Sequence, residues 1–286
     1  MADDAPLSTI ADTAHWIAYF RGLESARSDA LFSDPWAARL AGSKGVALGG
    51  RLEQGEAIAR AIAVRTTTID RLLTEVIREQ QVELVLNLAA GMDTRPWRLP
   101  LPAALQWVDV DAPAVLNFKR ALMQSHAPAC RYRACAADIT RAGLSAVLAD
   151  VVGAGQRILV LTEGLLVYLS AGQVADLARE LRSMACQWWL LDLAGPKALP
   201  VLEQLWGPVL GTAPGTFQFA PADPGTFFDR CGWRETLYLS AREEARRLGR
   251  PMPMPWLLRV LLWLSTDSRR QEFRRLSGVL LLTAGS

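Results

Sequence analysis

The chain has 286 residues, a length that allows one large domain or two small ones. Hydrophobic residues make up 51% of it and charged residues 21%, which is typical of a globular protein with a sizeable core. The 31 basic and 29 acidic side chains leave a formal net charge of +2. This balance argues against nucleic acid or an anionic membrane as a partner held by bulk charge.

The cysteines and histidines are not spaced as metal ligands. The four cysteines include no CxxC pair and only two histidines could join them, so we expect no metal and four buried thiols. These residues are Cys130, Cys135, Cys186, Cys231, His15 and His126. Residues 1–6 are acidic where a signal peptide is basic, and the most apolar run, 256–264, is too short to span a bilayer. We therefore expect a cytoplasmic protein.

The first third of the chain reads as helical. Residues 7–45 suggest short helices with a turn at Asp34-Pro35, and apolar residues recur at helical spacing from 53 to 80. Within this second segment Thr66, Thr67 and Thr68 lower the helix propensity, because three β-branched residues stand in a row. An amphipathic helix is thus predicted ahead of the first strand.

Short apolar runs then alternate with helical patterns. The runs at 84–88, 106–110, 131–137, 158–162 and 188–193 suit strands buried on both faces of a parallel sheet, and helical patterns occupy 113–125, 144–152 and 171–184. This alternation predicts a doubly wound, Rossmann-like α/β sheet.

The alternation ends after the fifth run. Two closing strands are predicted at 232–239 and 278–282, and a Pro/Gly-rich stretch at 195–224 is long enough for a lid. Nine arginines lie between Arg242 and Arg275, against four acids; a solvated helix face is the plain interpretation, and steering of an acidic acceptor or partner binding is the alternative. We expect one domain, 1–286, with a helical cap at 1–52, a lid insertion at 195–230 and a basic helical insertion at 240–276.

Ligands of open α/β sheets bind at the carboxyl ends of the strands, so the residues there are informative. The first strand runs into a small-residue turn, 87–95, that holds one glycine, Gly91, instead of the three of a dinucleotide fold. Asp93 in this turn would also oppose a pyrophosphate. The turn therefore favours a phosphate-free, cationic cofactor over NAD.

Acids follow the second and third strands. Asp111 lies 20 residues beyond Gly91 (111 − 91), about the spacing at which an acid reaches a ribose; capping the helix that starts at Pro113 is the alternative. Asp138 could bind the amino group of a base while Ile139 covers its face, or Asp138 could be another cap.

Glu163 ends a very apolar run after the fourth strand, where a carboxylate needs a partner. It could face a cationic group of the cofactor, or it could be a buried carboxylate at a helix start.

Several segments together resemble one family. They are 87–99, 110–113 with Lys119, 138–139, 163–169, 63–70, 33–36, 223–224 and 231–233. The chain resembles, over roughly 15–285, the leucine carboxyl methyltransferase-like group of class I S-adenosylmethionine-dependent methyltransferases, which includes tetracenomycin-type polyketide O-methyltransferases. The two closing strands and the lid fit a seven-stranded methyltransferase sheet better than an all-parallel dinucleotide sheet.

The resemblance implies S-adenosyl-L-methionine as cofactor and a role for each matching residue. Arg65 would pair with the methionine carboxylate, Ala89 to Gly91 would line the methionyl part, Asp111 would hold the ribose, Asp138 and Ile139 the adenine, and Glu163 the aminoacyl end. Arg21 and Tyr168 are expected near the acceptor, Arg21 otherwise near the cofactor. Ala89 replaces the family's usual glycine, which narrows the cradle by a methyl group.

The acceptor is expected to be a small molecule with a reactive oxygen. A carboxylate is ionised at pH 7 and needs no base, whereas a phenol does, and neither histidine lies in a site segment. A carboxylate on a small or polyketide-like metabolite is therefore favoured; a phenol or hydroxyl stays open, since carboxylates or tyrosines could act as base. Trp206, Trp233, Trp256 and Trp263 could wall the pocket, although core packing is favoured for most. An NAD-dependent oxidoreductase and a non-catalytic cofactor-binding protein remain the alternatives.

Overall fold

The computed structural model describes residues 13–50, 55–139, 143–210, 216–251 and 266–285, with the side chains of 205–210 and 268 left aside. These residues form a seven-stranded sheet in the order β3-β2-β1-β4-β5-β7-β6. The strands are β1 Leu84–Leu88, β2 Gln106–Asp111, β3 Arg131–Ala136, β4 Ile158–Thr162, β5 Trp188–Ala194, β6 Trp233–Ser240 and β7 Ser277–Ala284. The first five run parallel, and β7 is antiparallel to both β5 and β6. The predicted seven-stranded, Rossmann-like sheet with two closing strands is confirmed.

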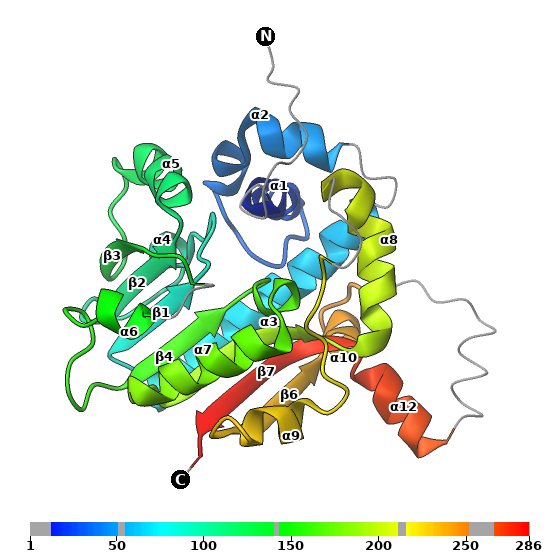
Figure 1. Cartoon of the computed structure of the whole chain (residues 1–286). Coiled ribbons are helices and arrows are strands. Elements are labelled where there is room, and N and C mark those ends of the chain that lie inside the picture. The colour runs from blue at the N-terminus through cyan, green and yellow to red at the C-terminus, as the bar shows by residue number, and fades with distance from the viewer. Residues whose placement is uncertain (1–12, 51–54, 140–142, 211–215, 252–265, 286) are drawn as a thin grey trace.

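The sheet is deepest at β1 and β4, the point where strand order reverses. Both strands are buried along their whole length, as their continuous apolar runs predicted. Helices α6 (Leu144–Val147), α7 (Ala171–Ser183) and α9 (Pro224–Asp229) cover one face, and α3 (Gly55–Glu79) covers the other. Figure 1 shows α7 in front of the sheet and α3 behind it. The crevice at the strand ends between β1 and β4 is thus where a ligand is expected.

The N-terminal helices pack beyond the carboxyl ends of the strands (Figure 1). Helices α1 (Thr13–Ser25) and α2 (Ala37–Gly49) flank the predicted turn at Asp34-Pro35. Trp16 and Phe20 of α1 join a core cluster with Ile58 and Ile62 of α3, so α1 is held against the start of that helix. Large apolar side chains fix this position by burial.

Helix α3 runs unbroken through the three threonines. Thr66 and Thr68 are buried against the fold, and the Thr67 hydroxyl donates to the Ala63 carbonyl oxygen at 2.8 Å. Tertiary packing therefore outweighs the weak helix propensity of these residues. The helix predicted at 144–152 is shorter than expected, ending at Val147.

The remaining helices are short or lie at the edges. They are α4 Arg95–Arg98, α5 Pro113–Met123, α8 Leu199–Leu210, α10 Ala241–Arg247 and α12 Asp267–Arg274, with 3-10 turns η2 Leu166–Tyr168 and η3 Pro196–Ala198. The four cysteines are buried and unpaired, as predicted. Within the described ranges, no helix is both long and apolar enough to cross a membrane. The apolar run 256–264 lies outside those ranges.

Candidate active site

A cavity of about 1080 Å³ opens at the carboxyl ends of the parallel strands. Helices α1, α3 and α8 complete its walls. Its size is at the upper end of ordinary ligand pockets, enough for a nucleoside cofactor beside an acceptor. Every residue predicted for the site lines it: Arg21, Arg65, Ala89, Gly91, Asp111, Asp138, Ile139, Glu163 and Tyr168.

The loop after β1 is shaped by two residues in the left-handed region. Ala89 has φ of 54° and Gly91 has φ of 49°. The positive φ favours glycine at position 91, and a Cβ there would make a tight contact of 3.1 Å with the Cβ of Ala14. Alanine at 89 accepts a backbone cost of roughly 1–2 kcal/mol that a glycine would avoid.

Asp111 ties β2 to this loop. Its Oδ2 accepts from the Gly91 amide at 2.7 Å and its Oδ1 from the Ala112 amide at 2.7 Å. The N-cap of α5 is Ala112, and no side chain caps it, so the capping alternative for Asp111 is wrong. A carboxylate has about four acceptor positions, which leaves room for further donors such as ribose hydroxyls. Burial raises the pKa of Asp111 above its ordinary value.

Arg65, Glu163 and Asp192 form a chain of ion pairs across the strand ends. Arg65 Nε lies 2.9 Å from Glu163 Oε1, and Arg65 Nη1 lies 3.0 Å from Asp192 Oδ2. Arg95 Nη2 approaches the other Glu163 oxygen at 2.8 Å. Glu163 is therefore compensated by two guanidinium groups, whereas the sequence suggested a carboxylate available to a cofactor cation. Burial would raise the pKa of Glu163, but Arg95 and Arg65 outweigh it and hold that pKa below its ordinary value.

Asp192, at the end of β5, was missed by the sequence analysis. It lines the cavity, and its Oδ1 accepts from the Gly164 amide at 2.7 Å. Burial raises its pKa against the opposing charge of Arg65. The rule that found Asp111 and Glu163, an acid at a strand's carboxyl end, would also have found Asp192.

The sequence predicted that the Asp93 carboxylate faces the ligand with its charge uncompensated. The structure shows instead that it is paired within the loop. It is buried and accepts from the Arg95 amide at 2.8 Å, from Arg95 Nη1 at 2.7 Å and from Asn87 Nδ2 at 3.1 Å. Burial opposes its ionisation, but Arg95, first among several cations, drives the pKa of Asp93 well below its ordinary value. Arg95 compensates the charge of Asp93 within the loop. Repulsion of the pyrophosphate of NAD by Asp93 is therefore not supported.

Asp109, near the end of β2, is the centre of a buried group of polar side chains, called the platform below. Its fully buried carboxylate accepts from Lys119 Nζ at 2.6 Å and from the Tyr132 hydroxyl at 2.8 Å. Trp107 Nε1 and Asn87 Nδ2 add hydrogen bonds of 2.8 and 3.0 Å. Because Asn87 also donates to Asp93, the hydrogen bonds around Asp109 connect β2 to the turn 87–95 that follows β1, called the cofactor loop below. Lys119 belongs to the matching motifs, and this is its place.

The other half of the cavity is mostly apolar. Its walls come from α3, α8, the η2 turn and the start of β7, with side chains of Ile58, Ile62, Val167, Val201, Leu202 and Leu276. Tyr168 lies in this wall, and burial raises its pKa to about 12. Lys197 also lines this half; its partner is Glu272, at 2.8 Å, and both side chains are at least half exposed.

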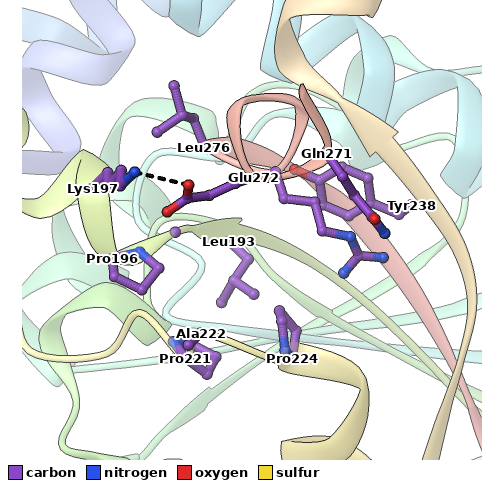
Figure 2. Close-up of a pocket in the computed structure, with 12 residues that line it drawn as sticks. Leu193, Pro196, Lys197, Pro221, Ala222, Pro224, Tyr238, Gln271, Glu272 and Leu276 are labelled. Atoms are coloured by element: carbon purple, nitrogen blue, oxygen red, sulfur yellow. Dashed lines mark ion pairs between the residues drawn. The ribbon is translucent and has the colours of Figure 1, made fainter. Parts of the chain in front are cut away.

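A smaller cavity of about 220 Å³ adjoins this apolar half (Figure 2). Leu193, Lys197 and Leu276 line both cavities, and Figure 2 shows the ion pair of Lys197 with Glu272 at the rim of the smaller one. The two cavities are thus neighbours that share part of their walls.

The histidines and the tryptophan of β6 lie elsewhere. His15 packs edge-on against Phe118 at 4.8 Å, His126 packs against Trp36 at 5.7 Å, and neither lines the cavity. Trp233 is buried in the core against Trp189, so core packing is the correct interpretation for it. The Trp206 side chain and all of Trp256 and Trp263 lie outside the described part.

Comparisons with known proteins agree with this geometry. The family model for leucine carboxyl methyltransferase matches residues 14–182. A candidate S-adenosyl-L-methionine-dependent methyltransferase from Frankia alni is 33% identical over 261 residues, covering 85% of this chain and 90% of its own. One from Streptomyces coelicolor is 32% identical over 251 residues, covering 84% and 88%. The crystal structure of a candidate methyltransferase from Thermobifida fusca superposes with a TM-score of 0.60 at 16% identity, over 99% and 97% of the two chains, which shows the shared fold. The chain belongs to the leucine carboxyl methyltransferase family and is an S-adenosyl-L-methionine-dependent methyltransferase, as the sequence predicted.

Proposed function

We propose that this enzyme methylates a carboxylate oxygen of a small acceptor that has a large apolar part. The cofactor occupies the half of the cavity formed by β1, β2 and β4, and the acceptor occupies the half walled by α3 and α8. Bound S-adenosylmethionine supplies an electrophilic methyl group on a sulfonium. The protein's own contribution is to align the two partners and exclude water, effects worth up to roughly 7–11 kcal/mol in well-oriented systems.

The residues at the strand ends fit the cofactor chemically. Asp111 keeps acceptor positions for the ribose hydroxyls, and Asp138 with Ile139, both in the cavity wall, suits the adenine amino group and ring face. Arg65 uses Nε and Nη1 for its two ion pairs, which leaves Nη2 for the methionine carboxylate. Glu163, itself paired with Arg65 and Arg95, then holds the Arg65 guanidinium at that end of the cavity.

One observation carries the choice of a carboxylate: no histidine lines the described cavity wall, and Asp192 and Glu244, acids not assigned to the cofactor, are already paired. Both histidines lie elsewhere, and burial raises the pKa of Tyr168 to about 12, too high for a base at neutral pH. Asp192 is engaged by Arg65 and the Gly164 amide, and Glu244 is paired with Arg71 and Arg247. A carboxylate acceptor, with an ordinary pKa near ~4, needs no base, whereas a phenol near ~10 does.

The apolar walls and Lys197 suit an anionic, largely hydrophobic acceptor. The ion pair of Lys197 with Glu272 is exposed and such pairs contribute only about 0–1 kcal/mol, so Lys197 can exchange partners at little cost. An incoming carboxylate would be drawn to it while the hydrophobic part lies against α3 and α8.

The test uses two acceptors with the same apolar skeleton, one a carboxylic acid and one a phenol, and methyl-labelled cofactor. We expect label in the acid, at a rate that does not rise between pH 6 and pH 9, because the acid is ionised throughout. Label in the phenol alone, at a rate that climbs with pH, would contradict the proposal.

A further inference from the structure

The turn between α1 and α2 contains residues 33–36, one of the segments that match the family. Its Asp34 side chain is completely buried, and Asp34 Oδ2 lies 3.0 Å from Arg21 Nε. The same oxygen accepts from the Thr94 hydroxyl at 2.7 Å. Thr94 is the N-cap residue of α4 and belongs to the loop that follows β1. The turn is therefore attached to the cofactor loop by a buried, charge-assisted hydrogen bond.

Helix α1 meets the same loop at two more places. Arg21 Nη2 donates to the Met92 carbonyl oxygen. Ala14 packs so closely on Gly91 that a Cβ there would lie 3.1 Å away. The N-terminal helices thus touch the loop at Gly91, Met92 and Thr94, and the first of these supplies the amide that binds Asp111.

The attachment depends on all of its members. The other Asp34 oxygen, Oδ1, is buried and accepts no hydrogen bond from the described residues, and Arg21 Nε contacts Oδ2 as an ion pair without hydrogen-bond geometry. The charge of Arg21 and the hydroxyl of Thr94 therefore compensate the buried carboxylate. Arg98 Nε is more distant, at 3.9 Å, and its guanidinium binds Asp70. Loss of either partner would leave the buried Asp34 carboxylate with too little compensation for its lost hydration. Arg21 and Thr94 should therefore stay in place.

We propose that Asp34 and Arg21 are positioning residues for the cofactor. Through Thr94 and Met92 they fix the loop so that the Gly91 amide and the Asp111 carboxylate keep the geometry that the ribose requires. On this proposal Arg21 acts on the cofactor through the loop, which is the second of the two placements, near the acceptor or near the cofactor, that the sequence left open for it. The inference rests on the proposed assignment of Asp111 to the ribose.

The deciding variant is Thr94→Val, which keeps the shape of Thr94 and removes its bond to Asp34. Because the loop loses its buried hydrogen bond to a charged group, we expect the Kd for S-adenosylmethionine to rise about tenfold. The effect should fall on cofactor affinity and not on turnover at saturating cofactor. Thr94→Ser, which restores the hydroxyl, should recover most of the affinity. Arg21→Lys, which keeps the charge but not the fork geometry, is the second variant should Thr94→Val fold poorly.

Glu24→Gln is the matched control. Glu24 is buried in α1 like Arg21, pairs with Arg250 at 3.3 Å and accepts from the Leu31 amide at 2.8 Å, so it holds the start of the same turn without contacting the loop after β1. It should lower the melting temperature without changing the Kd for the cofactor. Equal Kd values for the parent, Thr94→Val and Arg21→Lys, or an equal loss in Glu24→Gln, would overturn the proposal.

Asp111→Ala separates this inference from the proposed function. Weakened cofactor binding in Asp111→Ala but not in Thr94→Val would refute the positioning role alone. Unchanged binding in Asp111→Ala would refute the assignment of the ribose, and the positioning role with it. If both hold, the double variant should lose less affinity than the two single losses combined, since both act on one loop.

Discussion

The two halves of the cavity are built in different ways. Beneath the cofactor half, buried charges are linked from Lys119 through Asp109, Asn87 and Asp93 to Arg95, and on to Glu163. The half proposed for the acceptor has apolar helix faces and, among its described residues, the cation Lys197 in an exposed ion pair with Glu272. Rigid, mutually dependent polar contacts suit a fixed cofactor, whereas apolar walls can change with the acceptor at little cost to the fold. Substitutions should therefore have large and coupled effects on one side and small, local effects on the other.

The largest effect is expected at the platform under β2. Asp109→Ala leaves Lys119 buried without its counter-charge, and removal of one partner of such a pair costs about 3–5 kcal/mol. Urea unfolding should show this loss in the free energy of unfolding. Asp150→Ala, which breaks an exposed pair with Arg133, should leave the free energy of unfolding nearly unchanged. Equal losses in the free energy of unfolding of Asp109→Ala and Asp150→Ala would contradict the claim that buried charge pairs contribute more to stability than exposed ones.

The next effect concerns Arg65, which joins the two halves. Arg65→Lys keeps a charge but cannot bind Glu163, Asp192 and a carboxylate together, so the KM for the cofactor should rise about tenfold or more. Arg60→Lys, in the same helix but in an exposed pair with Glu56, should leave that KM unchanged. Steady-state kinetics with varied cofactor measure both.

Acidification should separate two carboxylates of the ion-pair chain. The pKa of Glu163 is lowered, so its contribution to stability is complete above its ordinary pKa of about 4.3 and is lost as pH falls through the folded value. The pKa of Asp192 is raised, so its ionised form weakens the folded state above that pKa, and this penalty disappears as pH falls.

The two variants should therefore change the acid sensitivity in opposite directions. The free energy of unfolding of Glu163→Gln should fall less steeply than the parent's once the pH drops below about 4.3, and that of Asp192→Asn should fall more steeply than the parent's as the pH drops from 7 to about 4. Urea titrations at several pH values provide the slopes. A change of the same sign in both variants would contradict the assignment.

The smallest effect is expected at Lys197. Lys197→Ala should raise the KM for an anionic acceptor about two- to fivefold, in line with the modest energy of exposed charge pairs, and leave the melting temperature within about 1 °C of the parent's. The exposed Lys44 of α2 provides the control, because Lys44→Ala removes a charge away from the cavity. An equal change in KM in both variants would indicate a general charge effect.

The sequence predicted the strands and the lining of the site better than its side-chain partners. The ends of β1 and β4 fell where their apolar runs stop, and acids such as Asp111 and Glu163 were found by position alone. The pairing of Arg65 with Glu163 and Asp192 joins residues 98 and 127 positions apart, which no local pattern records. Asp93 was likewise predicted to face the ligand, whereas its charge is compensated by Arg95, two residues further along the chain.

The most direct test is a calorimetric titration of S-adenosylmethionine into the parent and into Asp111→Ala, with the melting temperature of each protein as a check on folding. The proposed site predicts that Asp111→Ala binds at least about tenfold more weakly, because the ribose loses its carboxylate partner and the Gly91 amide loses its own. Equal affinity in the two folded proteins would contradict the placement of the cofactor across these strand ends.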